Sequence, residues 1–209
     1  MGIGSHMAGK AETTKRIIEC SMALAAEHGW RNTSLGDISE AASLSLAELH
    51  KHYGSKTDIL AAFIERTDGA VLAGVGKAVA KPTDANGGDE PESVRDLLFD
   101  VLMRRLDALK PYKSAVRCIA RDLARDPLGL LCLLPHQARS LAWMLESAGV
   151  SSAGVRGRVR TRGLGLVYLS ALRAWFRDDS EDLGPTMAAL DRALGQAEAA
   201  VLSAPFRCL

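Results

Sequence analysis

The sequence has 209 residues, of which 47% are hydrophobic and 24% are charged, and its formal net charge is +1. This composition excludes collagen-like, disordered and disulfide-rich proteins. A near-neutral chain also offers no global attraction to nucleic acid or to an acidic membrane, so any basic surface must be local. Alanine, leucine and arginine dominate while aromatic residues make up only 5%, which predicts an all-α protein.

The beginning of the chain and the cysteines bear on processing and location. We interpret residues 1–7 as a cloning remnant, and no run of about 18 apolar residues predicts a membrane span. The four cysteines lie far apart and none forms a C-x-x-C pair; they are Cys20, Cys118, Cys132 and Cys208. This spacing favours separate thiols in a reducing cytoplasm. We expect no metal, no cofactor and a cytoplasmic protein.

Capping residues divide the first 60 residues into short segments. Gly29 ends a first helix, and Ser34 with Asp37 has the spacing of a capping box. Ser55 with Asp58 repeats that spacing before a long apolar helix. The predicted helices span 10–28, 35–42, 45–52 and 55 onward. The closely joined middle pair predicts a helix-turn-helix unit.

The rest of the chain predicts a larger helical body. Residues 81–91 are rich in Gly, Pro, Asp and Asn, which predicts a loop. Beyond it, proline and glycine positions divide five further helices, expected at 91–110, 112–125, 127–148, 152–177 and 182–202. The sequence therefore predicts roughly nine helices and no strand.

Several residues of the first segment form a motif. They are Gly29, Thr33-Ser34, Asp37-Ile38, Ala41-Ala42, Leu44-Ser45, Tyr53, Gly54-Ser55-Lys56 and Ile59-Leu60. Together they resemble the DNA-binding unit of TetR-family transcriptional regulators. The resemblance implies an all-α, TetR-like fold with an N-terminal helix-turn-helix three-helix unit and a C-terminal helical ligand-binding and dimerisation domain. The expected division is a tail at 1–9, the DNA-binding domain at 10–60, a connecting helix and loop at 61–90, and the C-terminal domain at 91–205.

The same resemblance implies a set of DNA contacts. Ser45, Leu46, Glu48 and His50 of the recognition helix would face bases or sugars. Thr33 and Lys56 match the phosphate contacts, and Lys51 is a further phosphate partner. Leu46 departs from the family, in which this position is commonly basic or polar, and His50 stands where a tyrosine is usual.

The charge of this segment leaves an alternative open. From Lys10 to Leu60 there are six cations and seven anions, whereas phosphate contacts normally supply most of the affinity for DNA. The outward face is positive only if some of the carboxylates point elsewhere. The alternative hypothesis is that the fold is retained without DNA binding.

A second resemblance lies in the C-terminal body. Residues 140–146, 173–183 and 186–194 are similar to the lipid-binding accessory protein of coenzyme Q biosynthesis. That family is TetR-like in fold and binds isoprenoid lipid in its C-terminal cavity. Its amphipathic membrane-docking helix has no counterpart before Leu209, so we expect no stable membrane insertion.

Apolar side chains of the body are candidates for a ligand pocket, because small-molecule sites are mostly hydrophobic. They are Met103, Leu131, Leu134, Trp143, Met144 and Trp175. The alternative is that these residues are core or dimer contacts. Four arginines at 156, 158, 160 and 162 spread around a helix and favour a solvated or interface surface.

No catalytic motif occurs in the sequence, because nucleophile–base, P-loop and H-E-x-x-H patterns are missing, and we expect no enzyme. The hypothesis is a homodimeric regulator whose binding to operator DNA is controlled by a small apolar or lipid-like ligand. The alternative is an isoprenoid-binding or lipid-binding accessory protein that does not bind DNA.

Overall fold

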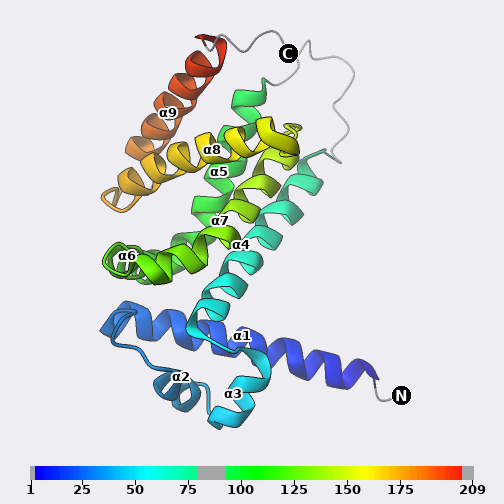
Figure 1. Ribbon diagram of the computed structural model, residues 1–209, viewed down its shortest axis with the longest axis vertical. Coiled ribbons are helices and arrows are strands. Elements are labelled where there is room, and N and C mark those ends of the chain that lie inside the picture. Colours follow the sequence, from blue (N-terminus) through cyan, green and yellow to red (C-terminus); the bar gives the residue numbers. More distant parts are fainter. Residues whose placement is uncertain (1–2, 80–92, 204–209) are drawn as a thin grey trace. The chain divides into compact units, whose positions relative to one another are not determined.

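The structure, a computed structural model, describes residues 3–79 and 93–203, and the side chains of residues 9–74 and 93–200. In these ranges the chain forms nine α-helices and no strand, which confirms the all-α prediction (Figure 1). The helices are α1 (Ile3–His28), α2 (Leu35–Ala41), α3 (Leu46–His52), α4 (Lys56–Val79), α5 (Val94–Leu109), α6 (Lys113–Leu123), α7 (Pro127–Ser147), α8 (Gly154–Trp175) and α9 (Gly184–Ser203), with a 3-10 turn at Lys110–Tyr112. The predicted loop at 81–91 and Cys208 lie outside the described residues.

The chain divides into two compact units. The first unit comprises Met1–Arg66 and Pro111–His136, and the second comprises Thr67–Lys110 and Gln137–Leu209. Helices α4 and α7 each contribute one part to each unit. The predicted domain boundaries stay predictions, but α1 begins at Ile3, inside the segment that we interpreted as a remnant and tail. Within the described ranges, no helix has the length and apolarity needed to cross a membrane.

Short local signals set the helices of the first unit. Gly29 ends α1 with a φ of +84°, a conformation that glycine adopts without steric cost. The Oγ of Ser34 accepts the Asp37 N–H at 3.1 Å, and an Asp37 carboxylate oxygen accepts the Ser34 N–H at 2.7 Å, so the predicted capping box begins α2. Ser43 turns the chain between α2 and α3 with a φ of +53°. The pair α2–α3 is therefore a helix-turn-helix.

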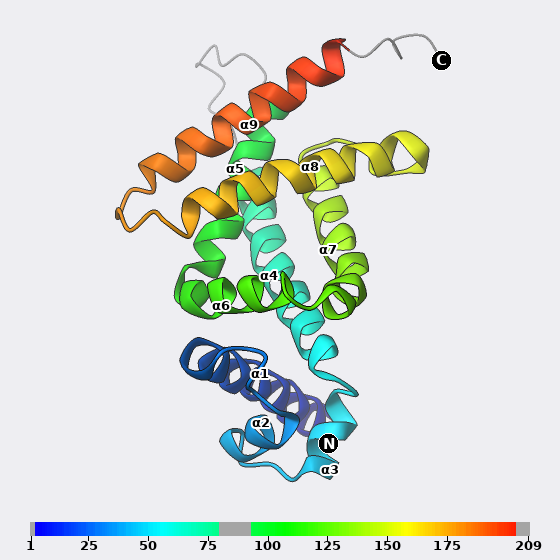
Figure 2. The same cartoon turned by 60° about the vertical axis from the view of Figure 1, so that its left-hand side comes forward.

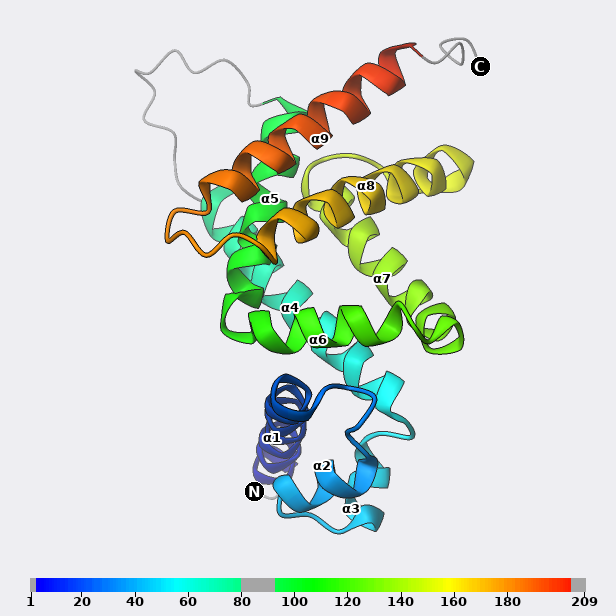
Figure 3. The ribbon, with the colours of Figure 1, turned by 90° about the vertical axis from the view of Figure 1, so that its left-hand side faces the viewer.

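Helix α1 is the centre of the first unit. It lies between α6 on one side and α2 with α3 on the other (Figures 2 and 3). Ile17, Ser21 and Ala25 are fully buried, as the periodicity of the sequence predicts. Glu19 is held at the α6 side, because it accepts hydrogen bonds from Arg66 at 2.8 Å and from the hydroxyl of Tyr112 at 2.7 Å. The result is a small helical core with α3 on its surface.

The second unit is built around α5, α8 and α9, which pack on one another. Its core contains Leu102, Leu106, Met144, Trp175 and Leu190, each of them almost fully buried. At about 25 cal/mol for each Å² of apolar surface removed from water, such side chains supply most of the stability of the unit.

A buried polar network lies inside this apolar core. The guanidinium of Arg105, which is 2% exposed, donates to a carboxylate oxygen of Asp68 and, through Nε, to the hydroxyl of Tyr168 at 3.2 Å. The hydroxyl of Ser140 donates to the same Asp68 oxygen at 2.7 Å. The neighbouring Tyr168 and Asp68 raise the pKa of Arg105 although burial alone would lower it. The network joins α4, α5, α7 and α8 within the unit.

The turn between α8 and α9 is held by Asp178. Its carboxylate accepts hydrogen bonds from the hydroxyl and N–H of Ser180 and from the N–H and hydroxyl of Thr186, and these bonds lower its pKa to about 2. Because the pKa is lower in the folded protein than in the unfolded chain, the ionised group stabilises the fold above pH 3.8. This stabilisation is lost as the pH falls towards 2.

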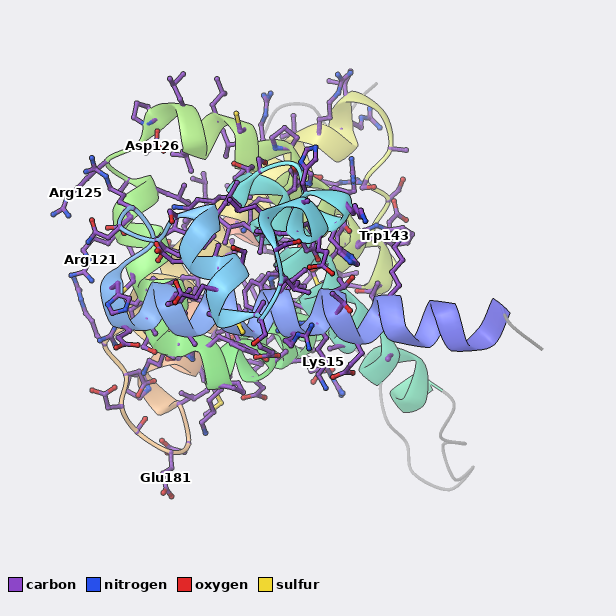
Figure 4. All side chains as sticks on the ribbon, turned by 90° about the horizontal axis from the view of Figure 1, so that it is seen from below. Lys15, Arg121, Arg125, Asp126, Trp143 and Glu181 are labelled. Atoms are coloured by element: carbon purple, nitrogen blue, oxygen red, sulfur yellow. The ribbon has the colours of Figure 1, made fainter. Side chains whose placement is uncertain are left out.

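We expect Asp178→Asn to lower the melting temperature at pH 5, and we expect its difference from the wild type to shrink as the pH falls below 3.8. Melting curves followed by circular dichroism between pH 2 and 6 measure this. Glu181→Gln is the control, because Glu181 projects from the same turn into solvent (Figure 4). A constant difference between Asp178→Asn and the wild type over the whole pH range would contradict the assignment.

Candidate nucleic-acid interface

Helix α3 begins with a second capping box. The Oγ of Ser45 accepts the Glu48 N–H at 3.2 Å, while an oxygen of Glu48 accepts the Ser45 N–H at 2.8 Å and its hydroxyl at 2.7 Å. These bonds, backbone first, lower the pKa of Glu48, so its charge is held at the helix start. Ser45 and Glu48 were both predicted to face bases or sugars. The structure shows their side chains engaged with each other in capping α3.

The outward face of α3 carries other residues. Leu49 is buried against the rest of the unit, and the helical period then turns Leu46, Ala47, His50 and Lys51 to solvent. Leu46 is 58% exposed. Of the predicted base-facing residues, Leu46 and His50 are therefore both exposed and on the surface of α3. Lys51, predicted to contact phosphate, is exposed beside them.

Thr33 and Lys56, the other two predicted phosphate contacts, are brought together inside the unit. Thr33 is buried, and its hydroxyl donates to the Gly29 carbonyl at 2.9 Å. The ammonium of Lys56 donates to the carbonyls of Thr33 and of Trp30, the latter at 2.5 Å, and lies 4.5 Å from the centre of the Trp30 ring. Burial lowers the pKa of Lys56. In this structure, Lys56 ties the start of α4 to the turn after α1.

We expect Lys56→Met to destabilise the protein by about 1–3 kcal/mol, because it leaves two partly buried carbonyls without their donor. Urea denaturation followed by circular dichroism measures the loss. Lys51→Met is the matched control, since Lys51 is exposed, and its effect is expected to stay within about 0.5 kcal/mol. Equal losses in the two variants would contradict the internal role of Lys56.

The structure places beside α3 one further cation that was not among the predicted DNA contacts. Arg16 of α1 lies close enough to α3 that its charge, with that of Lys51, contributes to lowering the pKa of Glu48. The same part of α1 meets the end of α3, where the Oγ of Thr14 is 3.5 Å from Nδ1 of His52. Arg16 and its neighbour Lys15 are both exposed, and Figure 4 labels Lys15. In the sequence, the pair Lys15-Arg16 directly precedes two apolar residues, Ile17 and Ile18. This pattern could have indicated exposed cations on α1.

The carboxylates of residues 10–60 do not all lie on the α3 face. Glu19 is paired with Arg66, at 2.8 Å, on the α6 side of α1. Glu27 lies in the last turn of α1, and the carboxylates of Asp37 and Glu48 are engaged as caps. The charge count over residues 10–60 therefore includes Glu19, which is held away from α3, as well as Glu48, which stays ionised at the start of α3.

The six candidate ligand residues do not share one environment. Met144 and Trp175 are fully buried in the second unit, and Met103 is half-buried. Trp143 is 54% exposed, and Leu131 and Leu134 are exposed on the part of α7 that belongs to the first unit. Their assignment to a pocket stays a prediction. Within the described residues, no group of three or more His, Cys, Asp or Glu side chains is placed to hold a metal ion.

Comparisons with known proteins place the α1–α4 segment in a known domain class. Residues 17–63 match the family model described as bacterial regulatory proteins, tetR family. No curated protein matches the sequence.

Solved structures share the fold over nearly the whole chain. A TetR transcriptional regulator from Nitrosomonas europaea superposes with a TM-score of 0.66 and 22% identity, covering 89% of this chain and 98% of its own. A TetR transcriptional regulator from Rhodococcus sp. RHA1 superposes with a TM-score of 0.61 and 16% identity, covering 90% of this chain and 96% of its own. A putative TetR-family transcriptional regulator from Syntrophomonas wolfei superposes with a TM-score of 0.61 and 12% identity, covering 95% of this chain and 99% of its own. At these identities the likeness shows the fold.

Proposed function

We propose that this chain is a TetR-family transcriptional regulator, which binds operator DNA as a homodimer in the cytoplasm under the control of a small apolar ligand. The match of residues 17–63 to the tetR family model supports this proposal. The observation that supports DNA binding most directly is the outward face of α3. It presents Leu46, His50 and Lys51 to solvent on a helix-turn-helix whose start is fixed by its own capping box. In such a unit the second helix enters the major groove.

In this proposal, the side chains on and around α3 have different roles in DNA binding. Leu46 offers apolar contact to a thymine methyl group, and His50 offers a hydrogen bond to a base edge. Lys51 and Arg16 supply phosphate contacts, which position the helix without reading sequence. Ser45 and Glu48 act on DNA indirectly, by fixing the start of α3 through their mutual hydrogen bonds. Thr33 and Lys56 act in the same indirect way, from inside the unit.

Support for the homodimer comes from α8. Its Val155, Val159, Leu166 and Leu169 are all at least half exposed and share one face at helical spacing. Exposed apolar patches of this kind mark interaction sites. A second copy that brings the same face of α8 buries both stripes at once, as a two-fold symmetric dimer requires.

The likeness to TetR-family regulators supports the proposed control by a ligand. A ligand that binds one arrangement of the dimer more tightly shifts the population towards it, and thereby changes the spacing of the two α3 helices. Trp143 is a built-in reporter, because its half-exposed indole would change fluorescence on contact with an apolar ligand. We do not propose a lipid-carrier function, because no observation on the described residues favours it.

We expect Lys51→Gln to weaken binding to DNA from upstream of the protein's own gene and to reduce the salt slope of that binding by about 1. Fluorescence anisotropy titrations at several salt concentrations measure both quantities. Lys110→Gln, which removes an exposed charge from the second unit, is the matched control and is expected to leave both unchanged. Unaltered binding by Lys51→Gln would exclude this face of α3 as the DNA interface.

A further inference from the structure

A cleft of about 710 Å³ lies within the first unit, between the C-terminal end of α1, the turn that follows it, and α6. Its walls carry three guanidinium groups, on Arg31, Arg121 and Arg125. Arg31 stands on the turn, whereas Arg121 and Arg125 come from α6 and the residues directly after it. Figure 4 shows Arg121 and Arg125 side by side, near the C-terminal end of α1.

Two carboxylates also face the cleft, and both already have contacts. An Asp122 oxygen accepts the backbone N–H of Arg31 at 3.0 Å, which ties α6 to the turn. A Glu27 oxygen lies 3.8 Å from Nε2 of His28. With the histidine neutral, the lining has one positive charge in excess. In a cleft of this size, that excess favours an anionic occupant.

Among the described residues, the three arginines form no ion pair with a carboxylate. Arg121 donates to the Sγ of Cys118 at 3.2 Å, a weak acceptor. The arginines do not serve the open end of α1 either, because the carbonyls of His28 and Gly29 accept from the side chains of Asn32 at 2.8 Å and Thr33 at 2.9 Å.

We propose that this α1–α6 cleft binds a small, multiply charged oxyanion of the phosphate or polycarboxylate class through Arg31, Arg121 and Arg125. Guanidinium groups present fixed pairs of N–H donors that match the oxygens of both classes. An anion held from both walls joins the turn after α1 to α6, beside the existing contact between Arg31 and Asp122. The site is separate from the DNA face, because α1 lies between α6 and α3 (Figure 3).

Isothermal titration calorimetry of the full chain tests the proposal, with pyrophosphate and citrate as probes at constant ionic strength. We expect saturable one-site binding of at least one probe, and the tighter of the two assigns the class. The Arg121→Gln/Arg125→Gln variant is expected to lose affinity by about tenfold or more, since charge-assisted hydrogen bonds are lost. Thermal melting of each variant confirms that it is folded.

The matched control is Arg156→Gln/Arg158→Gln, which removes two exposed arginines from α8 and is expected to bind like the wild type. Equal affinities in the two double variants would overturn the proposal, because binding would then depend on total charge alone. Absence of heat with both probes would also overturn it. No DNA is present in this experiment, so its outcome is independent of operator binding.

Discussion

Replacing Arg105 by alanine is expected to destabilise the protein by about 3–5 kcal/mol, the cost of leaving a buried charge without its partner. Asp68 would lose its guanidinium partner and keep the hydrogen bond from the Ser140 hydroxyl, and the hydroxyl of Tyr168 would lose the Arg105 donor. Urea denaturation followed by circular dichroism measures the loss. In a domain with a total stability of about 5–15 kcal/mol, this loss is a large fraction.

Two further variants separate the buried network from a general loss of charge. Arg104→Ala removes the neighbouring arginine, which is exposed enough to meet solvent and pairs with Asp100 at 2.6 Å, and it is expected to cost less than about 1 kcal/mol. The double variant Arg105→Met/Asp68→Leu removes both buried charges, and we expect it to recover much of the stability lost in Arg105→Ala. A double variant that is less stable than Arg105→Ala would contradict this account.

Leu166→Glu is expected to convert the proposed homodimer into a monomer and to weaken the proposed binding to operator DNA by about 100-fold. Leu166 is 71% exposed at the centre of the α8 apolar face, and a charge there would be buried against the same face of a second copy. A monomer engages one half-site at a time and loses the effective concentration that links the two. Analytical ultracentrifugation and anisotropy titration measure the two effects.

Leu128→Glu is the matched control, because it makes the same substitution at a leucine of similar exposure, 74%, on α7. We expect this variant to remain dimeric and to bind DNA like the wild type. If Leu128→Glu dissociates the dimer and Leu166→Glu does not, the interface lies on α7 and the assignment to α8 is wrong.

Local signals predicted the helices well, because each depends on neighbours within four residues. The capping box of Ser34 and Asp37 begins α2 where the spacing indicated, and Gly29 and Gly149 follow α1 and α7 with positive φ. The start of α1 was different, since we set aside residues that continue the helix to Ile3. Gly4 and Gly9 lower the helical propensity of that segment, so its composition did not indicate a helix.

Contacts distant in sequence were beyond the reach of the same signals. Lys56 matched a phosphate contact by position, but its ammonium donates to carbonyls 26 and 23 residues earlier. Nothing local indicates that Asp68 and Arg105 meet, or that α6 packs against α1. Trp143 and Met144 are adjacent in sequence, yet one is exposed and the other buried, because consecutive residues of a helix point in different directions.

The excess of anions over cations in residues 10–60 was the main objection to DNA binding. The structure weakens this objection, because not all of these anions lie on the α3 face. Glu19 is hydrogen-bonded to Arg66 and Tyr112 on the α6 side of α1. Lys51 on α3 and Arg16 on the neighbouring part of α1 are exposed, and Glu48 stays ionised as the cap of α3. Charge counted along the sequence does not give the charge of a face. The geometry therefore supports DNA binding more strongly than the composition did.

The salt dependence of binding to DNA from upstream of the protein's own gene tests the central claim most directly. We expect the logarithm of the association constant to fall linearly with the logarithm of salt concentration, and affinity for the upstream DNA to exceed that for a scrambled duplex by about 10³-fold or more. Equal affinity for both duplexes, or no binding at low salt, would contradict the proposal that this protein is a DNA-binding regulator.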